Sequence, residues 1–176
     1  MQTARAVKSW GRSGTGTLGW FVAVGAVLAI SCASPFGGAG PCDGLVYKEH
    51  GLNRLEYLPC AGEMIATMGR IRPELSAALA GDRSAESRAR NMLVNLSGLI
   101  KKAGGRNLLE RWEDQSLTSL NVDIWNAYSH YQAGLMVPVV AAGHPGEAAA
   151  NEAREDEFRR GNDVAERAKR LYERLR

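Results

Sequence analysis

Residues 64–79 read MIATMGRIRPELSAAL, and this stretch decides the fold class. Its apolar side chains recur at spacings of three and four residues, which is the repeat of one buried helix face. Gly81 is expected to end the helix, because glycine adopts the left-handed conformation of a helix C-terminus without strain. Pro73 lies inside the pattern and predicts a kink or a new helix start near Arg72. The predicted buried face comprises Met64, Ile65, Met68, Ile71, Leu75, Ala78 and Leu79.

Two further long apolar patterns follow along the chain. The second helix is expected to have Asp82 or Ser84 as its N-cap and to end with Lys101 and Lys102, whose charges suit a helix C-terminus. The third should bend or end at Pro138, because proline disrupts a helix interior. The second is predicted to bury Ala85, Ala89, Met92, Leu93, Leu96, Leu99 and Ile100, and the third Leu117, Leu120, Ile124, Tyr128, Tyr131 and Leu135.

Residues 147–176 are mostly charged, with acids at the start and bases at the end, as the dipole of one continuous helix favours. Pairs four residues apart, such as Asp163–Arg167 and Glu166–Arg170, are expected to add support. Because the apolar stripe is narrow, three arrangements are open: a fourth bundle member, an extension into solvent, or pairing with another chain. The stripe consists of Phe158, Gly161, Ala165, Ala168, Tyr172 and Leu175.

No strand-like alternation occurs between residues 61 and 176. The sequence therefore predicts an all-α fold, a small up-down helical bundle of three to four helices over 61–176. Ahead of it we expect an export signal or membrane anchor at 1–31 and a flexible Gly/Pro tether at 32–44. Residues 45–60 are expected to form an irregular arm that a disulfide could close, and a short helix there is the open alternative.

The leader accounts for the charge imbalance of the chain. Arg5, Lys8 and Arg12 precede an uncharged apolar run at 18–30, as in an export signal. They are also the whole excess of the 22 Lys+Arg over the 19 Asp+Glu, so residues 32–176 are formally neutral. A general nucleic-acid binder needs a net basic surface, and we therefore expect no nucleic-acid partner.

The stretch LAISC at 28–32 resembles the end of bacterial lipoprotein signals. Leu28 lies one place earlier than that pattern prefers, and the resemblance covers the leader alone. It implies cleavage before Cys32 and lipidation of that cysteine, which would hold the protein to the membrane through its N-terminus. The expected location is the exported side of the membrane, at the cell envelope. A secretory signal cut after Ala33 and an uncleaved anchor are the alternatives.

Lipidation of Cys32 would leave an even pair, Cys42 and Cys60. Disulfides persist in exported proteins, so we expect these two cysteines to pair. Two unpaired thiols are the open alternative. A metal site is not expected, because the spacing is far from Cys-x-x-Cys and His50 brings no fourth ligand.

The chain has no phosphate-binding loop, no Gly-x-Ser-x-Gly elbow and no His-Glu-x-x-His motif. The best enzyme-like candidate is the polar ladder of Asp123, Asn126 and His130, which could orient a general base or bind a metal. A polar edge on a packed helix explains the same residues. A haem or metal bundle would pair His130 with a methionine, of which the candidates are Met64, Met68 and Met92, but methionines at helical spacing are typical core residues. We expect no cofactor.

Trp112 and Arg111 lie in a charged cluster between two helices, where loops often carry function. Together with Phe158 and Tyr172 they are the predicted partner surface, and the last helix is the predicted site of self-association or protein binding. The expected function is a structural or protein-interaction role for an exported, lipid-anchored protein. The alternative is an envelope enzyme or a metal-, haem- or ligand-binding protein that uses His130.

Overall fold

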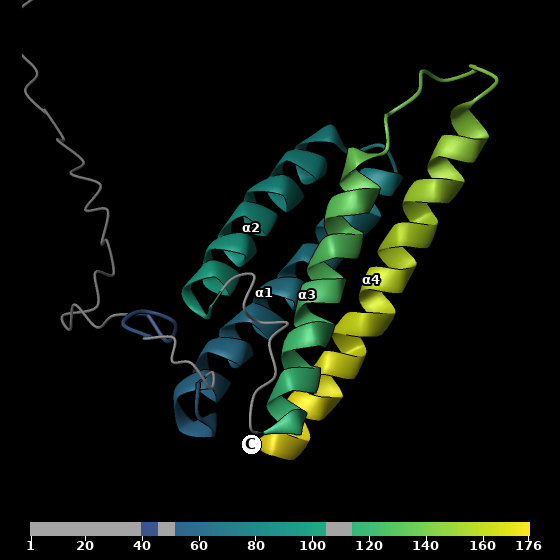
Figure 1. Cartoon of the computed structure of the whole chain (residues 1–176). Helices are drawn as coiled ribbons and strands as arrows, with labels where there is room; N and C mark the ends of the chain where they lie inside the picture. The colour runs from purple at the N-terminus through teal and green to yellow at the C-terminus, as the bar shows by residue number, and fades with distance from the viewer. Residues whose placement is uncertain (1–39, 46–51, 105–113) are drawn as a thin grey trace, which may run out of the picture. The chain divides into compact units, whose positions relative to one another are not determined.

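The computed structural model describes residues 40–45, 52–104 and 114–176. These residues form four helices, α1 (Arg54–Leu79), α2 (Arg83–Lys102), α3 (Gln115–Met136) and α4 (Glu147–Leu175). The helices run alternately in opposite directions (Figure 1). The most extensive contacts join α3 to α4 and α1 to α2, and α1 also packs against α4. The described part of the chain contains no strand, so the predicted all-α bundle is confirmed with four members.

The first helix begins earlier than the sequence pattern indicated. Asn53 and Glu56 form a capping box, in which each side chain accepts a hydrogen bond from the other residue's backbone N–H. This arrangement satisfies two of the N–H groups that a helix start leaves unpaired. Residues 54–60, expected to belong to an irregular arm, are therefore the first turns of α1.

Pro73 does not break α1, which is continuous from Arg54 to Leu79. A proline inside a helix removes one backbone hydrogen bond and crowds the carbonyl four residues earlier. That carbonyl belongs to Gly69, and both Gly69 and Pro73 lie on the solvent-exposed face. Water can bind the carbonyl there, so the helix continues without the restart expected near Arg72.

The other predicted helix ends are confirmed. Gly81 has a φ of +94° and follows the end of α1, and Gly104 has a φ of +126° just after α2. Asp82 is the N-cap of α2, since its carboxylate accepts hydrogen bonds from the backbone N–H groups of the second and third residues that follow it. The third helix ends at Met136, two residues before Pro138.

The predicted apolar faces form the core. On α1, two of the predicted residues lie at the edge of the buried face: Ile65 is partly buried, and Leu79 is 38% exposed. Of the α4 stripe, the first four residues are buried and the last two are partly buried. The last helix is therefore the fourth member of the bundle, and its apolar stripe is used within the chain. The fully buried side chains include Met64, Met68, Ile71, Leu75, Leu96, Ile100, Leu117, Leu120 and Ile124.

Glycines set how closely α3 and α4 approach. Phe158 of α4 lies against Gly134 of α3, where an added Cβ would stand 2.3 Å from the ring. In return, Tyr131 of α3 lies against Gly161 of α4, where an added Cβ would stand 2.6 Å from the ring. Each ring thus occupies space that only a glycine leaves open.

A disulfide joins Cys42 to Cys60, with 4.7 Å between the two Cα atoms. Both cysteines are buried. The same turn at residues 41–44 is tied to the end of α2, because Asp43 forms an ion pair with Lys102. The predicted pairing is confirmed; the bridge fixes the segment ahead of α1 to that helix, and the ion pair fixes it to α2. Within the described ranges, no helix is apolar over a length that would cross a bilayer.

Candidate functional site

Two members of the predicted polar ladder have partners on α4. Asp123 accepts three hydrogen bonds from Arg167: one from Nε to Oδ1 at 3.0 Å, one from Nε to Oδ2 at 2.8 Å and one from a terminal nitrogen to Oδ1 at 2.6 Å. This bidentate geometry is the strong form of a carboxylate–guanidinium pair. The Asp123 side chain is 10% exposed, and its hydrogen bonds raise the pKa of Arg167. Further along α3, Nδ1 of His130 lies 2.8 Å from Oε2 of Glu157.

The ladder does not converge into a catalytic or metal-binding arrangement. Asp123 and His130 lie two helical turns apart, about 10 Å along the axis, and each contacts a different α4 residue. Asn126 lies between them and is half-exposed. Among residues 40–45, 52–104 and 114–176, no group of three His, Cys, Asp or Glu side chains is placed to hold a metal ion. Both ladder contacts hold α4 against α3.

Tyr131 and Arg72 extend this polar contact between helices. The Tyr131 hydroxyl donates to Oδ1 of Asn162 at 2.9 Å, and burial raises the pKa of the phenol. Arg72 of α1 forms an ion pair with Glu166 of α4 and holds the pKa of that carboxyl below its usual range. The charges of Glu166 and Arg167, expected to pair within α4, therefore have α1 and α3 as partners instead. In the packed bundle, Glu166 lies beside Arg72 of α1 and Arg167 lies beside Asp123 of α3.

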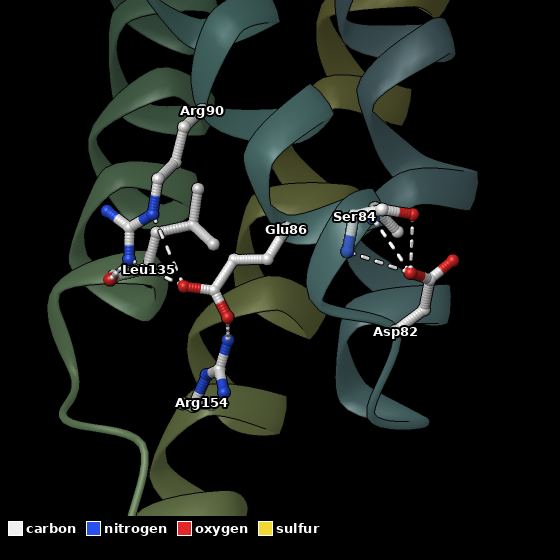
Figure 2. A network of polar contacts seen from close by, with 7 residues as sticks. Asp82, Ser84, Glu86, Arg90, Leu135 and Arg154 are labelled. Atoms are coloured by element: carbon white, nitrogen blue, oxygen red, sulfur yellow. Dashed lines mark hydrogen bonds and ion pairs between the residues drawn. The ribbon is translucent and has the colours of Figure 1, made fainter. Parts of the chain in front are cut away.

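A second polar cluster lies at the other end of the bundle (Figure 2). Glu86 of α2 accepts from Arg90 at 2.7 Å and from Arg154 of α4 at 3.0 Å. Arg90 also donates to the backbone carbonyl of Leu135 at 2.7 Å, which is in the last turn of α3. The Arg154 side chain is only 4% exposed, and its guanidinium lies 6.0 Å from the centre of the Phe158 ring.

This cluster joins three helices around a buried charge. The Glu86 carboxylate accepts hydrogen bonds from Arg90 and from Arg154, and these hold the pKa of Glu86 below its ordinary value. The sequence indicated no role for these residues, because each reads as one of many surface charges. Only the positions of Glu86 and Arg90 on one face of α2, four residues apart, could have suggested a pair.

An open groove of about 570 Å³ lies between the first turns of α3 and the last turns of α4. Its walls include the hydroxyl residues Ser116 and Ser119 and the aliphatic Val122 and Leu171. Arg167 and Arg174 lie along the α4 side, and Asp123 closes one part of the wall through its pair with Arg167. Pockets of this volume are typical of small-ligand sites. The sequence pattern did not predict it, since its walls come from two helices far apart in the chain.

The structure describes two of the four residues of the expected partner surface, Phe158 and Tyr172. Phe158 is 2% exposed and lies in the core, because Gly134 leaves room for its ring. Tyr172 is half-buried, with its hydroxyl over Gly62 of α1. Arg111 and Trp112, like Cys32, lie outside the described residues.

The methionines that a haem or metal site would use as ligands pack in or against the apolar core. Met64 and Met68 are buried among the apolar residues of α1, and Met92 packs partly against the same core. His130, their proposed partner as a ligand, has its Nδ1 against a carboxylate instead. The described side chains thus form contacts that hold the helices together.

Comparison of the chain with protein-family models, with curated proteins and with solved structures found no match.

Proposed function

We propose that this protein is exported, held at the cell envelope by a lipid on Cys32, and has a structural or protein-interaction role there. The leader supports export, with a basic start, an apolar run at 18–30 and a cysteine after a small residue. The folded part supports a role as a scaffold. Polar side chains such as Asp123, His130 and Glu86 form contacts between helices.

The observation that carries the proposal is the disulfide between Cys42 and Cys60. Disulfides persist in oxidising compartments outside the cytosol and are rare in proteins that stay inside it. The bridge closes the chain over a separation of 18 residues and lies close after the leader. An oxidised pair in the mature protein is what export to such a compartment would produce.

The absence of a converged site supports a role without catalysis. In the described ranges, Asp123 and His130 of α3 pair with Arg167 and Glu157 of α4. These pairs satisfy the charges and leave no nucleophile beside a base, which acyl or phosphoryl transfer would need. A rigid bundle with charged outer faces suits a binding or spacing role.

The mass of the intact protein tests the anchor. The full chain would be expressed in an exporting bacterial host, extracted from membranes and measured beside a Cys32→Ser variant. We expect a chain that begins at Cys32 and carries lipid, while the variant carries none and stays uncleaved. A chain cut after Ala33 without lipid would establish secretion, and an uncut chain would establish an N-terminal anchor; either refutes the lipid anchor.

Thiol alkylation tests the compartment. In protein taken from cells without reductant, neither Cys42 nor Cys60 should react with the alkylating reagent after unfolding, and both should react once a reductant is added. A Cys60→Ser variant should expose one reactive thiol at Cys42 and serves as the control. Free thiols at both positions in the freshly extracted protein would refute export to an oxidising compartment.

One observation keeps the alternative, a ligand-binding or catalytic protein that uses His130, open to test. The imidazole and its partner carboxylate on Glu157 are 32% and 25% exposed, so solvent reaches the pair. Replacing His130 with alanine separates the two functions. Capture of a membrane partner by the bundle should survive this change, whereas loss of an activity or of a bound metal would favour the alternative.

A further inference from the structure

The groove between α3 and α4 is lined by a cation that has no ion-pair partner among the described residues. Arg174 forms no ion pair with any residue in the described ranges, although it lies two helical turns beyond the paired Arg167 on α4. Ser116 faces the same groove, and its hydroxyl makes no hydrogen bond to a described residue. The groove therefore offers a guanidinium and a hydroxyl that remain available to a ligand.

The surroundings of the groove on α4 are basic. Residues 166–176 contain five basic side chains and two acidic ones, Glu166 and Glu173. Glu166 is already paired with Arg72 of α1. Three of the bases, Lys169, Arg170 and Arg176, are exposed on the same last turns of α4 without lining the groove, and they form no ion pair within the described part. The chain as a whole is neutral after the leader, so this end of α4 is a local concentration of positive charge.

The groove lies at the end of the bundle that the N-terminal segment joins. An ion pair of 2.8 Å between Arg54 and Asp114 places the start of α3 beside the start of α1. Cys60, in the second turn of α1, carries the disulfide to Cys42. Figure 1 shows the C-terminus at this same end of the helices.

The proposed lipid attachment keeps this end close to the bilayer. Cys42 follows Cys32 by ten residues, and ten residues of fully extended chain span at most about 35 Å. If Cys32 is lipidated, the disulfide end of the bundle stays within that reach of the membrane surface, where anionic phospholipid headgroups attract basic segments.

We propose that the groove binds the headgroup of an anionic phospholipid, an inference that rests on the membrane anchoring proposed above. Arg174 would bind the phosphate, because a guanidinium fork matches phosphate oxygens in two hydrogen bonds. Ser116 would donate a further hydrogen bond. Val122 and Leu171 would contact the glycerol and the first acyl carbons, which need apolar surface. The bound headgroup would orient the bundle with its disulfide end toward the membrane.

The test uses the full chain in a non-ionic detergent with short-chain lipids added in solution. Dihexanoyl-phosphatidylglycerol is the anionic probe, and dihexanoyl-phosphatidylcholine and inorganic phosphate are compared at equal concentration. Hydrogen exchange of residues 115–123 and 167–174 is measured without an additive and with each of the three additives. We expect protection by the phosphatidylglycerol alone. An Arg174→Ala variant should bind it about fivefold more weakly, as one basic residue at an anionic lipid surface implies.

Arg159→Ala is the matched control, since Arg159 is an exposed arginine of the same helix, 67% accessible and far from the groove. It should bind as the unaltered chain does. Three results would overturn the proposal: no protection by phosphatidylglycerol, equal protection by phosphate, or equal weakening by the two alanine variants. Protection at the groove by an acidic peptide but by no lipid would assign the groove to a protein partner instead.

The outcome is independent of the lipid anchor. The probe reaches the groove from solution, so the exchange measurement can succeed or fail whatever the mass of the chain shows at Cys32. A lipidated chain without groove protection would remove the headgroup site and keep the proposed anchor.

Discussion

Replacing Gly134 with alanine should destabilise the bundle, although alanine is the better helix former. An added Cβ would lie 2.3 and 2.6 Å from two carbons of the Phe158 ring, against an ordinary carbon–carbon contact of about 3.5–4.0 Å. The ring is 2% exposed and has the Arg154 guanidinium 6.0 Å from its centre. It therefore cannot move aside without displacing buried neighbours.

The magnitude follows from two opposing terms. Alanine gains about 1 kcal/mol of helix propensity over glycine, and overpacking a well-filled core costs about 1–3 kcal/mol or more. Because the overlap exceeds 1 Å, we expect the upper part of that range and a net loss of about 2 kcal/mol. For a domain of this size the midpoint of thermal unfolding should fall by about 5–10 °C.

The assay is thermal and urea unfolding of the full chain, followed by circular dichroism. Gly98→Ala in α2 is the control, because no atom lies within 4 Å of the Cβ it would add. This variant should be more stable by about 0.5–1 kcal/mol. In a Phe158→Leu background, Gly134→Ala should lose most of its cost. Equal stability of the two alanine variants, or an unchanged cost without the ring, would refute the packing argument.

Three further changes test other parts of the fold. Cys60→Ser should lower the free energy of unfolding by about 3 kcal/mol, measured in urea, and reductant should then have no further effect. Asn121→Leu should stabilise the chain by about 1 kcal/mol in the same assay, since neither amide atom of buried Asn121 has a hydrogen-bond partner among the described residues. Glu86→Gln should cost about 1–3 kcal/mol at neutral pH. The pKa of Glu86 lies below its ordinary 4.5 in the fold, so its contribution is present above that pH and lost as the pH falls below it. Acid titration of stability should therefore be flatter for the glutamine variant, and parallel curves would contradict this assignment.

The sequence predicted the helices well wherever local chemistry decides them. Asp82 ends one turn and caps the next helix by contacts within three residues, so no distant partner is needed. The start of α1 was missed because apolar periodicity fades in its first turns, although the Asn53–Glu56 capping box was present in the sequence. Pro73 was given too much weight, since its cost depends on whether the freed carbonyl meets solvent.

The partners of the polar ladder could not be predicted for a different reason. Asp123 and His130 were grouped because helical spacing places them near one face of α3. Spacing along one helix says nothing of which charges a neighbouring helix presents. The structure gives each a separate partner on α4, and it places Phe158 in the core beside Gly134.

By itself, the sequence determined the all-α class, a bundle of three to four long helices, the faces they bury and most of their ends. These depend on interactions over three or four residues, which the order of side chains specifies directly. Only the tertiary structure decided that α4 completes the bundle, that Glu86 joins three helices, and that Ser116 and Arg174 line one groove. Such contacts join residues of different helices, more than 20 positions apart in the chain, and their geometry exists only once the helices have packed.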